Sequence, residues 1–159
     1  MLIIVTLCVT IREIMSASTK LSTAVKALCY LAESHPEPKS SAMISSRIGV
    51  NASKLRKLLS MLTKNNIVES TQGISGGFLL KKDPKVLHLQ EIYCAIEDRK
   101  AFHLDVNYTK GEEQKETAKF NNYFLDLFAV VQVEIEDKMR GITLSNILKN
   151  VGMNSSYKS

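Results

Sequence analysis

The sequence predicts a mostly α-helical fold with one small β-hairpin (α+β), and three patterns predict it. Apolar residues recur at three- and four-residue spacing in several segments, which is the period of amphipathic helices. Three of the seven glycines fall between residues 73 and 77, flanked by the apolar runs "IV" and "FLL", as expected for a hairpin tip. A long apolar stripe follows near the carboxyl end. The 159 residues are 45% hydrophobic and 23% charged, a composition that permits a buried core.

Residues 1–14 are an apolar start that precedes a second methionine, Met15. The run from Leu2 to Val9 is much shorter than the roughly 18–20 residues that cross a bilayer. It also lacks the basic start and the cleavage site of a secretory signal. We interpret residues 1–14 as a non-essential N-terminal extension. A short extra strand or a membrane-touching segment is the alternative.

Periodicity and capping residues predict the first two helices. Apolar residues at i, i+3 and i+4 spacing cover residues 19–34, and the prolines of "HPEPKS" end this helix. A short second helix follows, with Ser40 or Ser41 as its N-cap and Gly49 as its stop.

The third helix, from Asn51 or Ser53 to about Asn65, separates leucines from basic side chains. At 100° per residue, its leucines centre on one side. The nearly opposite side carries Ser53, Arg56, Lys57, Ser60 and Lys64. Taken alone, this helix is most simply a surface helix with a solvated basic face. After a short helix and a turn at Gly49, it completes a helix-turn-helix outline.

The glycine-rich stretch "QGISGG" has two interpretations. A phosphate-binding loop would run from a strand into a helix and end in Gly-Lys-Ser/Thr. Here the glycines lead into "GFLLKKD" and then Pro84, so the hairpin interpretation is favoured. A hairpin directly after a helix-turn-helix is the wing of a winged helix. Residues 46–82 hold seven basic residues and one acidic residue, which favours a duplex nucleic acid as the partner of this surface.

The carboxyl-terminal half predicts three further helices. A fourth helix lies within "LHLQEIYCAIED", a long helix runs from about Glu116 to about Arg140, and "ITLSNIL" is a short closing helix with Thr143 as its cap. The long helix carries an apolar stripe of Phe120, Phe124, Leu127, Val131 and Ile135. Few elements remain to cover this stripe, so we expect it to pair with another chain. Packing onto its own domain is the alternative.

Together these residues resemble the Rrf-two family of bacterial winged-helix transcription regulators, from about Met15 to Leu148. The most specific match is the glycine-rich turn that ends in Gly76-Gly77-Phe78. "STKLSTAVKALCYLA" is similar to the family's opening helix, and "ITLSNIL" to its closing element. The implied organisation is a winged helix-turn-helix domain (15–98), a loop (99–115), a dimerisation helix with the closing helix (116–150) and a tail (151–159).

The resemblance implies a cytoplasmic homodimer, with no membrane partner, that regulates transcription, as a repressor, from a pseudo-palindromic site in double-stranded DNA. The implied DNA-binding residues are Lys20, Asn51, Ser53, Lys54, Arg56, Lys57, Lys64, Gln72, Gly73, Gly76 and Gly77. The family's wing has an arginine before its first glycine, whereas this chain has Gln72, so we expect weaker minor-groove readout. A protein-interaction module with an incidental basic face is the alternative function.

The sequence predicts no cofactor, no metal and no enzymatic activity. Cluster-binding members of the family have three cysteines in the loop after the fourth helix, but residues 95–119 contain none. The odd cysteine count and the absence of a CxxC pair indicate neither a disulfide framework nor a zinc site and suit a reducing cytoplasm. Cys29 and Cys94 lie beside apolar residues on predicted helices, which favours inert packing. A thiol switch at either residue is the alternative, and an unidentified small-molecule signal stays open.

Overall fold

The computed structural model describes residues 19–73, 75–97 and 114–157. The predicted extension (1–14) and nearly all of the predicted loop (99–115) lie outside the described residues. The first described element is a helix over residues 19–34. It is followed by α2 (Ser41–Ile48), α3 (Ala52–Lys64), β1 (Val68–Thr71), β2 (Gly77–Leu80), α4 (Leu89–Ile96), α5 (Gln114–Arg140) and α6 (Leu144–Asn150). The predicted mostly helical fold with one hairpin is confirmed.

Local hydrogen bonds explain where the short helices begin and end. The Ser40 Oγ accepts a hydrogen bond from the backbone N–H of Met43, at 3.2 Å, so α2 begins after Ser40. Gly49 ends α2 in the left-handed conformation, with φ at 68°, which costs glycine little. Thr143 caps α6 through its side-chain oxygen in the same way as Ser40 caps α2.

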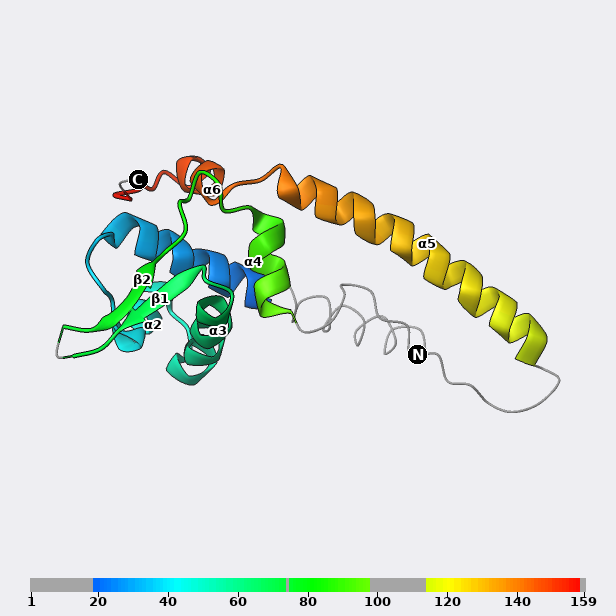
Figure 1. Ribbon diagram of the computed structural model, residues 1–159, viewed down its shortest axis with the longest axis horizontal. Helices are drawn as coiled ribbons and strands as arrows, with labels where there is room; N and C mark the ends of the chain where they lie inside the picture. Colours follow the sequence, from blue (N-terminus) through cyan, green and yellow to red (C-terminus); the bar gives the residue numbers. More distant parts are fainter. Residues whose placement is uncertain (1–18, 74, 98–113, 158–159) are drawn as a thin grey trace, which may run out of the picture.

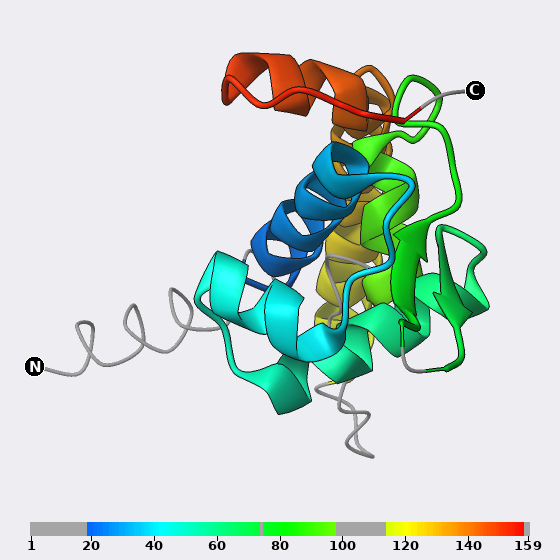
Figure 2. The same cartoon turned by 90° about the vertical axis from the view of Figure 1, so that its left-hand side faces the viewer.

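The helices 19–34, α2, α3 and α4 enclose one hydrophobic core, and the hairpin and α6 close it (Figures 1 and 2). No polar or charged side chain is buried among the described residues, so apolar burial dominates the stability of this domain. The largest fully buried side chains are Leu28, Leu31, Ile44, Leu55, Leu59, Leu62, Ile67, Leu80, Leu87, Ile92, Ile96 and Leu144.

The hairpin is anchored at its base and along one edge. β1 and β2 are antiparallel, with Val68 opposite Leu80 and Thr71 opposite Gly77. Lys39 adds an isolated bridge to Phe78 through two backbone hydrogen bonds of 2.9 and 3.0 Å. This contact was not predicted. It joins the segment before α2 to the outer edge of β2.

The long helix α5 projects from the core, with its amino end far from the domain and its carboxyl end in contact with α4 (Figure 1). α6 then packs on the domain and buries Leu144 and Leu148. A backbone hydrogen bond from Leu144 to Leu87, at 2.8 Å, joins this return to the start of α4. In the described part of the chain, no helix has both the length and the apolar character needed to span a bilayer.

Gly77 should be intolerant of any side chain. A Cβ added there would lie 2.6 Å from the backbone carbonyl of Lys39, because the edge bridge brings the two backbones together. We expect Gly77→Ala to lower the stability by about 1–3 kcal/mol, as overpacking does elsewhere. At Gly141 an added Cβ would meet an ordinary 3.5 Å contact, so Gly141→Ala is the matched control. Thermal unfolding measures both, and equal melting temperatures for the two variants would contradict the steric argument.

Candidate nucleic-acid interface

The helix α3 has one buried and one exposed face, as predicted. Its buried face consists of Leu55, Leu58, Leu59 and Leu62. Its exposed face carries Ser53, Lys54, Arg56, Lys57, Ser60 and Lys64. Each buried leucine contributes roughly 1.5–3 kcal/mol, so α3 cannot rotate about its axis without a large loss of stability. The exposed residues are therefore held facing solvent.

The basic residues near α3 differ in whether they have a partner. Arg47 forms an ion pair with Glu33 at 3.8 Å and lies over the Tyr30 ring. Lys82 forms an ion pair with Glu91. Within the described residues no ion pair involves the four cations of α3, which are Lys54, Arg56, Lys57 and Lys64. This α3 cation set, together with Lys81, whose Nζ hydrogen-bonds the uncharged Asn66 side chain at 3.2 Å, is thus the part of the predicted basic surface that forms no ion pair within the described residues.

Asn51 has a structural role at the start of α3. Its Oδ1 accepts hydrogen bonds from the backbone N–H groups of Ser53, at 2.9 Å, and Lys54, at 3.3 Å. The amide nitrogen of Asn51 is left as the group that could donate to a ligand. The exposed Ser53 hydroxyl lies in the first turn of the same helix, beside this cap.

The hairpin tip and α3 both lie on the side of the domain away from α6 (Figures 1 and 2). Gln72 and Gly73 are exposed in the tip. Gly76 and Gly77 have a structural explanation instead, because an added Cβ at either residue would collide with neighbouring backbone. The Thr71 hydroxyl, which no sequence pattern singled out, accepts a hydrogen bond from the Gly77 N–H at 3.1 Å and closes the turn.

Lys20 lies on the helix over residues 19–34 and not on α3. Its ammonium group is 3.6 Å from a carboxylate oxygen of Glu97, just after α4. The side chain is about half exposed, so it retains access to solvent. The Glu97 side chain is only 12% exposed, so moving Lys20 to a phosphate would leave a largely buried carboxylate without this ion pair.

Comparison with known proteins assigns the chain to a family. The model of the Rrf2 family, described as iron-dependent transcriptional regulators, matches residues 17–150. The chain belongs to the Rrf2 family. This confirms the resemblance found in the sequence and gives the chain the general character of a DNA-binding transcriptional regulator.

Two curated relatives and two solved structures illustrate the match. YwnA of Bacillus subtilis, named as an HTH-type transcriptional regulator, is 25% identical over 134 residues, which cover 84% of this chain and 98% of YwnA. The HTH-type transcriptional regulator IscR of Escherichia coli is 37% identical over 76 residues, 48% of this chain and 46% of IscR. IscR of T. potens superposes with a TM-score of 0.60 at 24% identity, covering 84% of this chain and 85% of that chain. A regulator from Lactobacillus plantarum reaches a TM-score of 0.74 at 19% identity, with 84% and 89% coverage. The two structures support the fold.

The family description raises the question of an iron site in this Rrf2 protein. The described residues contain no group of three or more His, Cys, Asp or Glu side chains that could hold a metal ion. The sequence has no cysteine after Cys94, and iron–sulfur clusters are held mainly by cysteine thiolates. The donor set in this chain therefore does not fit the loop-bound cluster of cluster-binding members.

The two cysteines that the structure describes differ in environment. Cys29 is buried, as expected for inert packing. Burial, together with the nearby Glu33 carboxylate, raises the pKa of its thiol to about 11. Cys94 is exposed, so the expectation of core packing was wrong for this residue. α4 turns the Cys94 side chain outwards while Ile92, Ala95 and Ile96 face the core.

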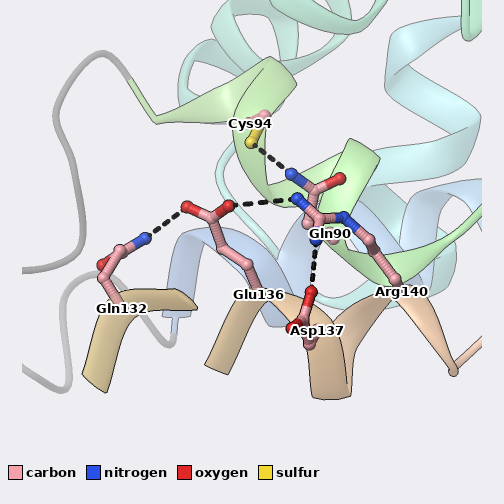
Figure 3. Close-up of polar contacts among 6 residues, drawn as sticks. All are labelled: Gln90, Cys94, Gln132, Glu136, Asp137 and Arg140. Atoms are coloured by element: carbon pink, nitrogen blue, oxygen red, sulfur yellow. Dashed lines mark hydrogen bonds and ion pairs between the residues drawn. The ribbon is translucent and has the colours of Figure 1, made fainter. Parts of the chain in front are cut away.

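Cys94 lies in a polar cluster between α4 and α5 (Figure 3). The Gln90 side chain donates a hydrogen bond to its Sγ at 3.3 Å. Partial burial and the nearby Glu136 carboxylate raise the pKa of this thiol, while Arg140 acts in the opposite direction. Arg140 itself pairs with Glu136, at 3.4 Å, and with Asp137. The thiol is accessible, but its surroundings do not favour the thiolate.

Thiol alkylation should separate the two cysteines. In a Cys8→Ser background, we expect iodoacetamide to modify Cys94 in the native protein and to reach Cys29 only after unfolding. Because the pKa of Cys94 is raised, its rate should increase about tenfold per pH unit through the neutral range. Mass spectrometry of the peptides measures both sites. Modification of Cys29 in the native protein at a similar rate would contradict the buried assignment.

Proposed function

We propose that this Rrf2 protein is a cytoplasmic homodimer that binds a pseudo-palindromic DNA site and represses transcription there. The observation that carries the proposal is the cation set of α3, held outwards by the buried leucines and unpaired within the described chain. A phosphate-tracking surface requires such exposed cations. A dimer that occupies promoter DNA acts most simply by excluding other proteins from it.

The residues of α3 have different proposed roles. Arg56 lies on the exposed face, where its guanidinium can form two hydrogen bonds to guanine in the major groove. Lys54, Lys57 and Lys64 would bind phosphates. Asn51 and Ser53, at the start of the helix, would contact bases or nearby phosphates, and Lys20 would reach the backbone from the neighbouring helix. These phosphate contacts position the protein without reading the sequence.

The wing is proposed to approach the minor groove through Gln72 and Gly73. The negative potential of a narrow minor groove attracts an arginine, so an uncharged glutamine contributes less binding free energy there than an arginine would. We infer that α3 supplies most of the sequence preference of this protein.

A protein-interaction module is the second candidate function, and we infer no enzymatic role. A protein partner would have to neutralise the cation set of α3, whereas duplex DNA supplies negative charge at regular spacing. Salt dependence of DNA binding separates the two functions.

The proposed dimer forms through α5. Much of the apolar surface of this helix is exposed in the single chain: Phe120 is 60% exposed, Tyr123 64%, Val130 59% and Leu127 42%. Val131 and Phe124 are partly exposed beside them, and Ile135 continues the stripe at 37%. The rings of Phe120, Phe124 and Phe128 form a contiguous row along the helix. An apolar stripe of this length is typical of a covered interface, and a second copy of α5 supplies a matching one.

The proposed signal is redox chemistry at Cys94 or an unidentified small molecule. Cys94 is favoured over Cys29 because its thiol is exposed, and it lies where α4 meets α5. Oxidation there would enlarge a side chain at the contact between the DNA-binding domain and the dimerisation helix.

The first test of this function is a comparison of Arg56→Ala and Lys57→Ala on a duplex selected by the wild-type protein from a randomised library. Arg56→Ala should lose about 1–3 kcal/mol per half-site and relax the preference at one base pair. Lys57→Ala should weaken all single-base variants of the duplex equally and make the salt dependence shallower. Fluorescence anisotropy titrations measure both. A uniform loss for Arg56→Ala would mean that it contacts only the backbone.

The second test concerns the dimer. Leu127→Asp and Val131→Asp together would place two charges in an apolar interface, at a cost of several kcal/mol, so we expect the variant to sediment as a monomer. Asn122→Asp adds a charge on the opposite side of α5 and should leave the dimer intact. A well-folded wild-type monomer in sedimentation equilibrium, or a dimeric double variant, would contradict the interface.

A further inference from the structure

The tail that follows α6 lies on the DNA-binding domain beside the base of the hairpin (Figures 1 and 2). Met153 and Tyr157 are partly buried against the core. The Ser156 N–H donates a hydrogen bond to the carbonyl of Ala32, at 2.9 Å, near the end of the helix over residues 19–34. The Tyr157 ring packs against His35, with 4.5 Å between the ring centroids.

The Tyr157 hydroxyl also contacts the base of the hairpin. It donates a hydrogen bond of 2.9 Å to the carbonyl oxygen of Lys81, the first residue after β2. The backbone N–H of Lys81 in turn donates a hydrogen bond of 3.0 Å to the carbonyl oxygen of Ile67, the residue directly before β1. Lys81 is therefore held on one side by the start of the hairpin and on the other side by the tail.

The outer edge of β2 is also connected to Tyr157. β2 is bonded to Lys39 through Phe78, and Lys39 lies four residues after His35, which the Tyr157 ring contacts. Tyr157 thus contacts the end of β2 directly, through Lys81. It also contacts, through His35, the segment that pairs with the outer edge of β2.

We propose that Tyr157 is a positioning residue for DNA binding: the tail 153–157 is a strap that fixes the angle between the wing and α3. This inference rests on the proposed function, because the angle matters only if α3 and the wing contact one duplex together. The strap leaves directly from α6, which follows the α5 dimerisation helix. The tail thereby links the wing, through α6, to α5, the proposed dimerisation helix.

Tyr157→Phe tests the strap, because it removes the hydroxyl and keeps the ring on His35. Asn154→Ala, at an exposed position of the same tail, is the matched control. Hydrogen–deuterium exchange without DNA should show faster exchange of the β1 and β2 amides in Tyr157→Phe than in the control, with similar melting temperatures. Unchanged exchange in the hairpin would overturn the strap, whatever the protein binds.

A double-mutant cycle then tests the role in DNA binding, on the duplex selected by the wild-type protein, with an A·T-rich flank. Tyr157→Phe should weaken binding about two- to tenfold, the range for one hydrogen bond. Gln72→Arg should tighten binding in the wild-type background, and most of that gain should vanish with Tyr157→Phe. The loss from Lys57→Ala should be the same in both backgrounds, because Lys57 acts from α3.

Two outcomes would overturn this role. The first is a DNA affinity of Tyr157→Phe equal to that of Asn154→Ala. The second is a gain from Gln72→Arg that is absent in the wild-type background or fully retained in the Tyr157→Phe background. Failure of the wild-type protein to select any duplex would instead reject the proposed function. The exchange experiment would still report on the strap in that case.

Discussion

The burial of the leucine face of α3 is the constraint on which the rest of the molecule depends. Leu55, Leu59 and Leu62 are fully buried, and replacing any one with alanine would cost roughly 2–5 kcal/mol. A domain of this size is stabilised by only about 5–15 kcal/mol in total. The rotation of α3 is thus determined by packing, and the outward direction of Lys54, Arg56 and Lys57 is a consequence of the core.

The other elements support this arrangement in different ways. α2 and the Gly49 turn set where α3 begins, and the Asn51 cap satisfies its first backbone donors. The hairpin continues directly from α3 through Ile67, which is fully buried, so the position of the wing is tied to that of the helix. α5 departs from this domain and carries its apolar surface outwards. One chain therefore has a basic surface and an apolar surface on separate elements.

Features with a local cause could be predicted from the sequence. Thr143 caps its helix because its side chain bonds a backbone donor three residues away, and the leucine period of α3 needs only helical geometry. The Lys39–Phe78 bridge, the exposure of Cys94 and the Tyr157–Lys81 hydrogen bond could not be predicted. Each joins segments far apart in the chain, or depends on which side of a helix another element covers. DNA contact by Gly77 stays a prediction, and the structure gives this glycine a separate reason, which is its close approach to the Lys39 backbone.

The salt dependence of duplex DNA binding by the wild-type protein tests the central claim most directly. If the cation set of α3 binds phosphates in both protomers, the logarithm of the affinity should fall with the logarithm of the salt concentration with a slope of about −4 to −8. The Lys54→Ala, Lys57→Ala double variant should bind more weakly, with a clearly shallower slope. A folded wild-type dimer whose DNA affinity is undetectable, or independent of salt, would contradict the account.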